Sequence, residues 1–177
     1  SFNELDLLQT GSNKVSFDAS ILEFITNLES RKSELFKRNY VYKNCSKDYI
    51  YNLIEYFVSL HPSVDVQTAK AITWIETGNL AAQSMLNKNN IFGGMSNGRL
   101  TSYPSIEYGV YKYISLLRSS YFDQGLRTVE QIGYKYNPTT IDGVKMANPT
   151  WVSNVNAYRN KFSSNVNIDS VEKLLNL

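Results

Sequence analysis

The chain has 177 residues, of which 42% are hydrophobic, and its net charge of +2 is too small to indicate nucleic acid as the main partner. This length suits one domain with a sizeable core, and no apolar run approaches the ~20 residues that span a membrane. A single cysteine excludes an internal disulfide and a single histidine excludes a histidine-based metal cluster, so we expect neither metal nor organic cofactor.

Residues 1–45 are expected to form a helical extension or a linker before the main domain. Asp18 is placed to begin a helix after the polar residues 1–16. The apolar positions of that helix would be Ile21, Ile25, Leu28 and Leu35. Because the chain opens with Ser1, we expect a processed product or a domain of a longer protein, set among neighbouring domains or in a virion.

Two helices are predicted next. Ser46 is placed to cap the first, which should end near His61-Pro62 because the residue before a proline disfavours helical geometry. Its apolar stripe consists of Ile50, Leu53, Ile54 and Phe57. Asp65 begins the second helix, and Gly78 ends it.

Residues 78–104 differ from the rest of the chain because they are rich in Asn, Gly and Ser. Asn97-Gly98 is a dipeptide favoured in tight hairpins, so this stretch is expected to form a small, irregular β-hairpin lobe. A helix should follow from about residue 106 to residue 121. Its inward residues would be Val110, Ile114 and Leu117.

Two further helices are predicted from their capping signals. Thr128 and Gln131 form a capping-box pair, and Asn148 followed by Pro149 is typical of a helix start. Their apolar residues are Val129, Ile132 and Tyr136 in the first, and Trp151, Val155, Tyr158 and Phe162 in the second. The fold class is therefore mainly α with one small β-hairpin lobe. The main domain spans residues 46–165, and a short C-terminal helix, capped by Asp169, lies within residues 166–177.

The residue that suggests chemistry is Glu76. On a helix it shares one face with Ala69, Ile72 and Thr73, so it would emerge on the side that packs into the core. Poor hydration there raises the pKa of a carboxyl group. A carboxyl that stays protonated near neutral pH is what general-acid cleavage of a glycosidic bond requires. The alternative is an ordinary surface glutamate near a helix end.

Several short motifs occur in the order in which a known family carries them. They are Glu76-Thr77-Gly78, Asn89-Asn90-Ile91-Phe92-Gly93, Tyr103-Pro104-Ser105, Thr128-Val129, Tyr136-Asn137-Pro138 and Asn148-Pro149-Thr150-Trp151. Over residues 47–163 this pattern resembles glycoside hydrolase family 73, the N-acetylglucosaminidases of bacterial autolysins and phage wall-lytic enzymes. That family belongs to the lysozyme superfamily, so the resemblance implies a lysozyme-like helical catalytic domain.

The resemblance implies hydrolysis of peptidoglycan glycan strands at the bond that follows N-acetylglucosamine. Glu76 would be the catalytic acid that protonates the leaving oxygen. Tyr136 would be a second catalytic residue, in place of a tyrosine that the family carries before its last helix. The residues expected to bind substrate are Asn89, Asn90, Phe92, Tyr103, Asn137 and Trp151. Each of these residues also has a structural interpretation, because asparagine favours turns and aromatic residues favour packing.

The chain departs from the family in its carboxylates. Many members carry a second acid in the hairpin, but this chain has no Asp or Glu between residues 77 and 106. Glu107 is more simply explained by the helix dipole, and Asp142 by a turn. We therefore expect a single-acid mechanism. The attacking group would be either the acetamido group of the substrate or a water positioned by polar groups such as Tyr136 and Asn137.

Two other functions stay open at this point. A muramidase or lytic transglycosylase also uses a lone glutamate on the same scaffold. A non-catalytic glycan-binding or structural module of a phage tail would keep only the fold. With peptidoglycan as the partner, we expect the protein to be secreted to the cell wall or associated with a phage virion.

Overall fold

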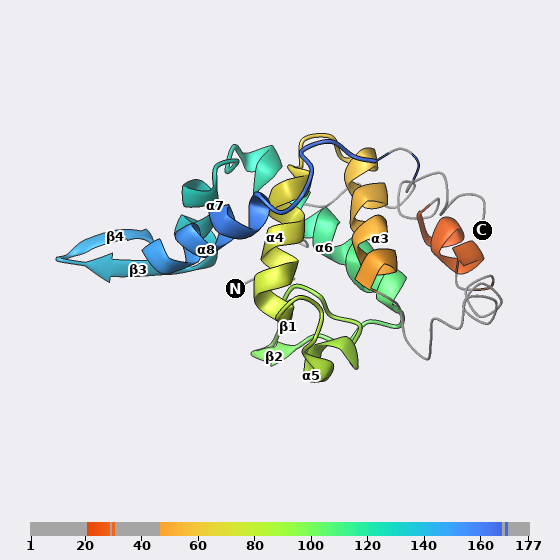
Figure 1. The fold of residues 1–177 in the computed structure, drawn as a ribbon. Helices are drawn as coiled ribbons and strands as arrows, with labels where there is room; N and C mark the ends of the chain where they lie inside the picture. Colours follow the sequence, from red (N-terminus) through yellow and green to blue (C-terminus); the bar gives the residue numbers. More distant parts are fainter. Residues whose placement is uncertain (1–20, 29, 31–46, 168, 170–177) are drawn as a thin grey trace.

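The computed structural model describes residues 21–28, 30, 47–167 and 169, and within them the chain is mainly helical with two small antiparallel hairpins (Figure 1). This confirms the predicted class of a mainly α fold with a small β-hairpin lobe. The elements in chain order are α3 (Lys47–Leu60), α4 (Val66–Thr77), α5 (Gln83–Leu86), β1 (Met95–Ser96), β2 (Arg99–Leu100), α6 (Ile106–Ser120), η1 (Phe122–Gln124), α7 (Val129–Tyr136), β3 (Pro138–Ile141), β4 (Val144–Ala147) and α8 (Pro149–Arg159). None of the described helices is long and apolar enough to cross a membrane.

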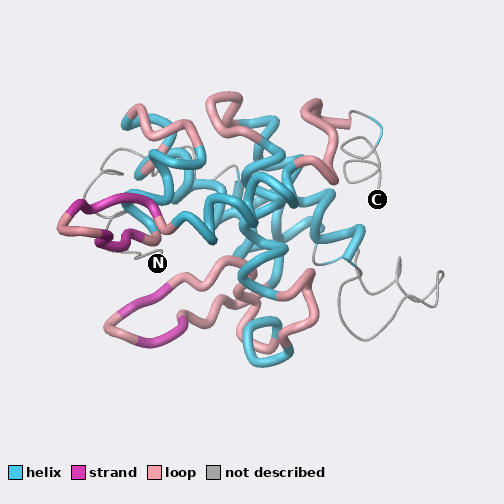
Figure 2. Tube along the Cα trace, turned by 60° about the vertical axis from the view of Figure 1, so that its left-hand side comes forward, coloured by secondary structure: helices cyan, strands magenta, loops and turns pink. Residues whose placement is uncertain are grey.

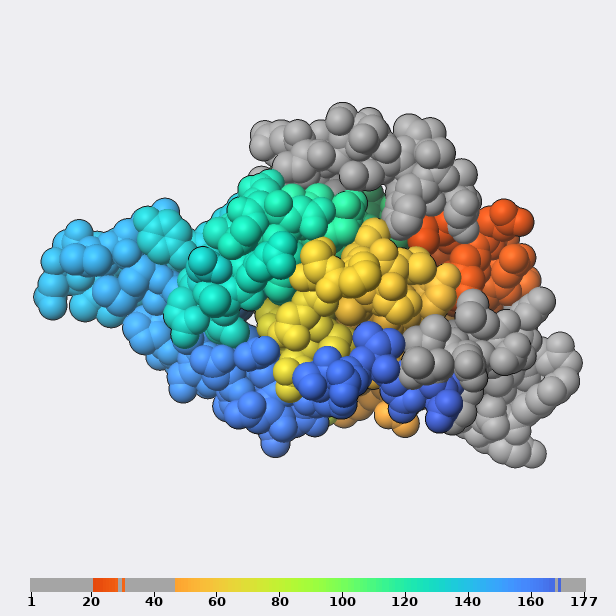
Figure 3. Space-filling view, turned by 90° about the horizontal axis from the view of Figure 1, so that it is seen from above, coloured from red at the N-terminus to blue at the C-terminus, as the bar shows by residue number. Residues whose placement is uncertain are grey.

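Helices α3, α4 and α6 form the centre of the molecule (Figure 1). The residues predicted to face inward are buried there: Ile50, Leu53, Ile54 and Phe57 on α3, Ala69 and Ile72 on α4, and Val110, Ile114 and Leu117 on α6. Tyr113 ties α6 to α4 by donating a hydrogen bond of 2.6 Å to the carbonyl of Ala69. Helix α8 packs along α4, and Figure 3 shows the β3–β4 hairpin projecting beyond this body at one end.

The described part of the N-terminal extension packs on the core. Residues 21–28 are helical, and three of the four predicted apolar positions are buried: Ile21, Ile25 and Leu28. Phe24 stacks on Tyr56 of α3 with ring centroids 4.1 Å apart. The predictions for Leu35, for the cap at Ser46 and for a C-terminal helix beyond Asp169 lie outside the described residues.

Local hydrogen bonds set most helix ends where the sequence predicts them. Asp65 caps α4 by accepting a bond of 3.1 Å from the backbone N–H of Thr68. Gly78 ends α4 in the left-handed conformation, with φ of 58°. The capping box of Thr128 and Gln131 is formed in full at the start of α7.

Two predictions for the C-terminal part are wrong. Helix α8 ends at Arg159, so Phe162 lies beyond it, where its ring packs 5.8 Å from that of Trp74 on α4. The sequence also predicts one hairpin, with only a turn at Asp142, whereas the structure has a second hairpin there, β3–β4. The sequence pattern does not predict these strands, because β3 begins with a proline and neither strand alternates between buried and exposed residues.

Both hairpins turn on a pair of left-handed residues. Asn97 and Gly98 have φ of 52° and 76°, and Asp142 and Gly143 have φ of 51° and 79°. Figure 2 shows the two hairpins projecting on the same side of the helical body. Strands β1 and β2 belong to the lobe at the C-terminal end of α4 (Figure 1), so the chain that leaves α4 directly builds the surface next to it.

Candidate active site

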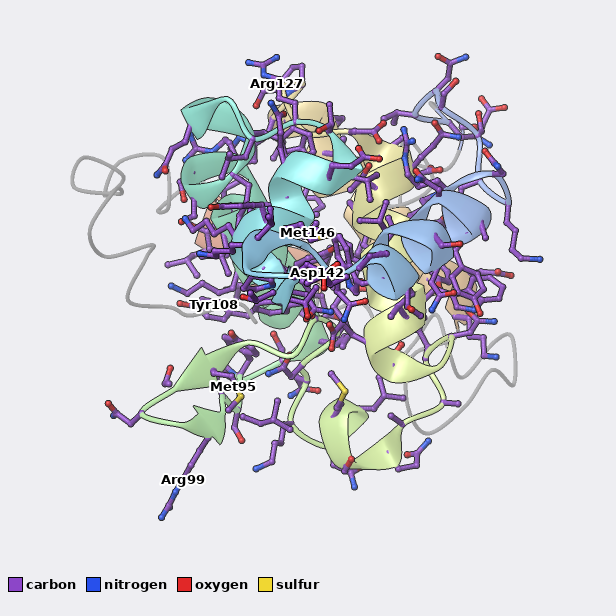
Figure 4. All side chains as sticks on the ribbon, turned by 90° about the vertical axis from the view of Figure 1, so that its left-hand side faces the viewer. Met95, Arg99, Tyr108, Arg127, Asp142 and Met146 are labelled. Atoms are coloured by element: carbon purple, nitrogen blue, oxygen red, sulfur yellow. The ribbon has the colours of Figure 1, made fainter. Side chains whose placement is uncertain are left out.

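Glu76 lies in the last turn of α4, at the end of the helix that Figure 4 shows beside the lobe of α5 and β1–β2. The three residues below it on the same face, Ala69, Ile72 and Thr73, are completely buried, as predicted. Glu76 itself is partly buried, and it makes no hydrogen bond or ion pair with any residue that the structure describes. Burial raises the pKa of the Glu76 carboxyl from its ordinary value of 4.5 to about 7.

Gly93 lies directly against this carboxyl group. A Cβ atom at Gly93 would be 3.1 Å from Oε2 of Glu76, and the backbone of Gly93 is left-handed with φ of 73°. Both observations favour glycine, since any other residue would strain the backbone and crowd the acid.

The chain reverses immediately after the acid. Gly78, Asn79 and Leu80 are all left-handed, with φ of 58°, 58° and 61°. Two hydrogen bonds hold this reversal: Tyr51 Oη donates to Asn79 Oδ1 at 2.9 Å, and the N–H of Leu80 donates to Thr77 Oγ1 at 2.7 Å. A left-handed leucine is rare, and such strain clusters at functional sites. Sequence reasoning recognised only Gly78 here, because nothing in the local pattern marks Leu80.

Tyr113 is a neighbour of Glu76 that sequence reasoning missed. It is fully buried, and burial raises the pKa of its hydroxyl well above the ordinary value, with a further increase from the charge of Glu76. Tyr113 therefore stays protonated and donates to the Ala69 carbonyl. Its position three residues after the inward-facing Val110 was the available signal.

Four of the residues predicted to bind substrate are buried in the structure. Asn90 and Phe92 have no exposed surface, and Tyr103 and Trp151 are each 6% exposed, so none of them presents a face to a sugar ring. Phe92 instead anchors the lobe to α6, with its ring 5.0 Å from that of Tyr113 and 6.0 Å from that of Tyr103. Asn90, Phe92 and Tyr103 are part of the core because the lobe folds down onto α6, and Trp151 is part of it because α8 packs on α7.

The other three predicted site residues lie in turns or in the core. Asn89 is left-handed, with φ of 55°, and its side-chain amide donates to the carbonyl of Tyr103 at 2.9 Å. Asn137 follows α7, and its carbonyl accepts from the N–H of Asn148 at 2.9 Å. Tyr136 is 5% exposed, with its ring 5.2 Å from that of Trp151. These contacts are structural, and a catalytic role for Tyr136 stays a prediction.

Glu107 and Asp142, the two less favoured candidates for a catalytic acid, both have defined positions in the fold. Glu107 lies in the first turn of α6, is fully buried and accepts a hydrogen bond of 2.9 Å from Tyr49 Oη. Asp142 occupies the exposed tip of the β3–β4 hairpin. Within the described part of the chain, no three His, Cys, Asp or Glu side chains gather into a group that would hold a metal ion.

Two surface hollows lie away from Glu76. One, of about 670 Å³, is mostly apolar and is lined by residues of α7, β4 and α8. The other, of about 700 Å³, lies at the start of α4 and is lined in part by Asp65 and Arg159. Glu76 lines neither of these two hollows, and its own side chain is partly exposed.

No protein-family model, curated protein or solved structure matches this chain. A reaction for this protein is therefore inferred from the residues around Glu76. There the carboxyl group of Glu76, whose pKa burial raises to about 7, has no hydrogen-bond partner among the described residues and lies next to a glycine-rich loop.

Proposed function

We propose that this protein cleaves the glycan strands of peptidoglycan as an N-acetylglucosaminidase, with Glu76 as the general acid. The observation that supports this proposal best is the partly buried carboxyl of Glu76, whose pKa is raised to about 7 by burial. At that pKa about half of the molecules carry the proton at pH 7, which suits a general acid. The order of the motifs around Glu76, which resembles that of wall-lytic glucosaminidases, supports the choice of substrate.

In the proposed reaction Glu76 donates its proton to the glycosidic oxygen while the bond from that oxygen to the anomeric carbon breaks. The anomeric carbon finally takes up the oxygen of a water molecule. The proton of that water passes to Glu76 on a retaining route, whereas on an inverting route it passes to solvent and Glu76 regains its proton from solvent. No Asp or Glu occurs between residues 77 and 106 to act as a nucleophile. The first attack therefore comes from the acetamido group of the substrate, which gives retention of configuration, or directly from water, which gives inversion.

The lone acid also supports a second candidate, a lytic transglycosylase. In that reaction a hydroxyl group of the muramic acid residue attacks its own anomeric carbon, so no water is consumed. The product then ends in anhydro-muramic acid. A glucosaminidase leaves reducing N-acetylglucosamine, and a muramidase leaves reducing muramic acid. Mass spectrometry of the fragments released from purified sacculi separates the three.

The test of the proposal is Glu76→Gln, which keeps the shape of the side chain and removes the proton. We expect turnover on purified sacculi to fall by ~10²–10⁴, with binding to the sacculi retained. The matched control is Glu130→Gln, the same change at an exposed position on α7, which should leave turnover unchanged.

Equal turnover of wild type and Glu76→Gln would reject Glu76 as the acid. A wild-type protein that binds sacculi and releases no fragments would instead indicate a non-catalytic glycan-binding or structural module. An enzyme with the proposed activity works at the cell wall, so we propose secretion to the wall or a place in a phage virion.

A further inference from the structure

We infer that Asn90 is a positioning residue for the acid: its buried amide fixes the loop of residues 90–94 in the shape that sets Gly93 against the Glu76 carboxyl. The catalytic consequence of this inference rests on the proposed function. Its structural part stands on the contacts of Asn90 and can be measured without any activity.

Every polar atom of the Asn90 side chain is used inside the loop. Its Oδ1 accepts three backbone N–H groups, those of Phe92, Gly93 and Gly94, at 3.2, 3.0 and 3.2 Å. Its Nδ2 donates to the carbonyls of Gly94 and Thr101, both at 3.0 Å. Asn90 has no exposed surface, so these bonds form away from competing water.

Asparagine alone matches this set of partners. An aspartate would accept the three N–H groups, but it would place an oxygen against the carbonyls of Gly94 and Thr101. A serine is too short to reach both sides of the loop. An alanine would leave the buried N–H groups without their acceptor, which is strongly unfavourable.

Packing also restricts the conformation of the loop of residues 90–94. A Cβ atom at Gly94 would be 2.6 Å from Cζ of Phe92 and 2.9 Å from Oη of Tyr103, so the backbone there already touches the aromatic cluster. The N–H of Thr101 also donates to the carbonyl of Gly94 at 2.9 Å. Asn90 and this packing together hold Gly93 where it covers Oε2 of Glu76.

Release of the loop should therefore admit water to the carboxyl and lower its pKa toward the ordinary value. Tyr113 interacts electrostatically with Glu76 and with Tyr51. Burial raises the pKa of both Tyr113 on α6 and Tyr51 on α3, so both stay neutral. The charged residues of the lobe are Lys88 and Arg99.

The experiment is a carbon NMR titration of glutamate carboxyl groups, in which the Glu76 signal is identified by its loss in Glu76→Gln. We expect Asn90→Ser to lower the pKa of Glu76 by one unit or more. The matched control is Asn148→Ser, because Asn148 Oδ1 accepts the N–H groups of Thr150 and Trp151 at the start of α8, at 3.0 and 3.2 Å. That variant makes the same substitution at a helix start away from the lobe, where serine can also act as a cap, and it should leave the pKa of Glu76 unchanged.

A folded Asn90→Ser variant with the wild-type pKa at Glu76, or an equal shift in Asn148→Ser, would overturn the inference. Hydrogen exchange on the wild-type protein gives a test that needs no variant. The amides of Phe92, Gly93 and Gly94 should be protected, since Asn90 accepts all three, and free exchange there would also overturn it. Failure of the proposed function would appear separately, as an inactive wild type.

Discussion

At Glu76, the burial that keeps a proton on the carboxyl at neutral pH also lowers the stability of the fold once that proton is lost. An ordinary surface glutamate is hydrated equally in the folded and unfolded chain and has no such effect. Under the proposed function, placing an acid on the inward face of α4 reduces stability in return for a proton donor, as is common at active sites.

The first prediction, at the scale of this residue, is a pH-dependent stability difference between wild type and Glu76→Gln. The folded pKa is about 7 and the unfolded pKa is near 4.5, so between these values the folded state binds more protons. The free energy of unfolding of the wild type should then fall as pH rises through this range, by roughly 3 kcal/mol at most. Glutamine does not titrate, so the free energy of unfolding of Glu76→Gln relative to that of the wild type should increase by up to that amount over the same pH range.

The measurement is urea denaturation of both proteins at pH 4 and pH 8. Glu130→Gln is the control, because the same substitution at an exposed site should show no comparable gain. If the difference in the free energy of unfolding between wild type and Glu76→Gln does not increase from pH 4 to pH 8, the raised pKa of Glu76 is contradicted.

At the scale of elements, α4 is held on three sides, and this fixes where its last turn points. Tyr113 of α6 bonds to its backbone, and Trp74 stacks on Tyr158 of α8 with centroids 5.2 Å apart. Lys70 pairs with Glu55 of α3 at 2.6 Å, with both residues buried. These three contacts come from α6, α8 and α3, so the position of Glu76 depends on the packing of all three helices against α4.

The second prediction concerns the buried pair of Lys70 and Glu55. Lys70→Met should destabilise the protein by about 3–5 kcal/mol, because it leaves the Glu55 carboxyl buried without its partner. The double variant Glu55→Leu/Lys70→Met should recover most of that loss. Denaturation by urea measures both.

The exposed ion pair of Arg118 and Asp123, at 3.1 Å, supplies the control. Asp123→Asn should change the free energy of unfolding by no more than about 1 kcal/mol. The prediction would fail if Lys70→Met were equally mild, or if the double variant were less stable than the single one.

At the scale of the whole molecule, the lobe beside Glu76 is positively charged although the chain as a whole is close to neutral. Residues 78–105 contain Lys88 and Arg99 and no Asp or Glu. Figure 4 shows Arg99 projecting from the β1–β2 hairpin, at the opposite end of this face from Arg127. The stem peptides of peptidoglycan carry carboxylates, so under the proposed function this distribution of charge would favour strands that keep their peptides.

The third prediction is that Arg99→Gln raises KM for peptide-bearing strands about two- to fivefold at low salt, with the difference shrinking as salt screens the charge. Arg127→Gln removes a positive charge at the opposite end of this face of the molecule and should have little effect on KM. Steady-state kinetics at two ionic strengths measures both variants. Equal effects of the two substitutions would reject a local role for the lobe.

The sequence alone determined the features that depend on neighbours along the chain. The ends of α4 at Asp65 and Gly78, the capping box at Thr128 and the turn at Asn97 each rest on hydrogen bonds or backbone angles within a few residues. The place of Glu76 on the inward face of its helix follows from the helical period.

The tertiary structure decided which of the motif residues face inward. Phe92 and Tyr103 are buried because the lobe folds onto α6, and Trp151 because α8 packs on α7. The approach of Gly93 to Glu76 also joins two separate segments. Such contacts form between parts of the chain that no local pattern relates, so periodicity and capping signals cannot reveal them.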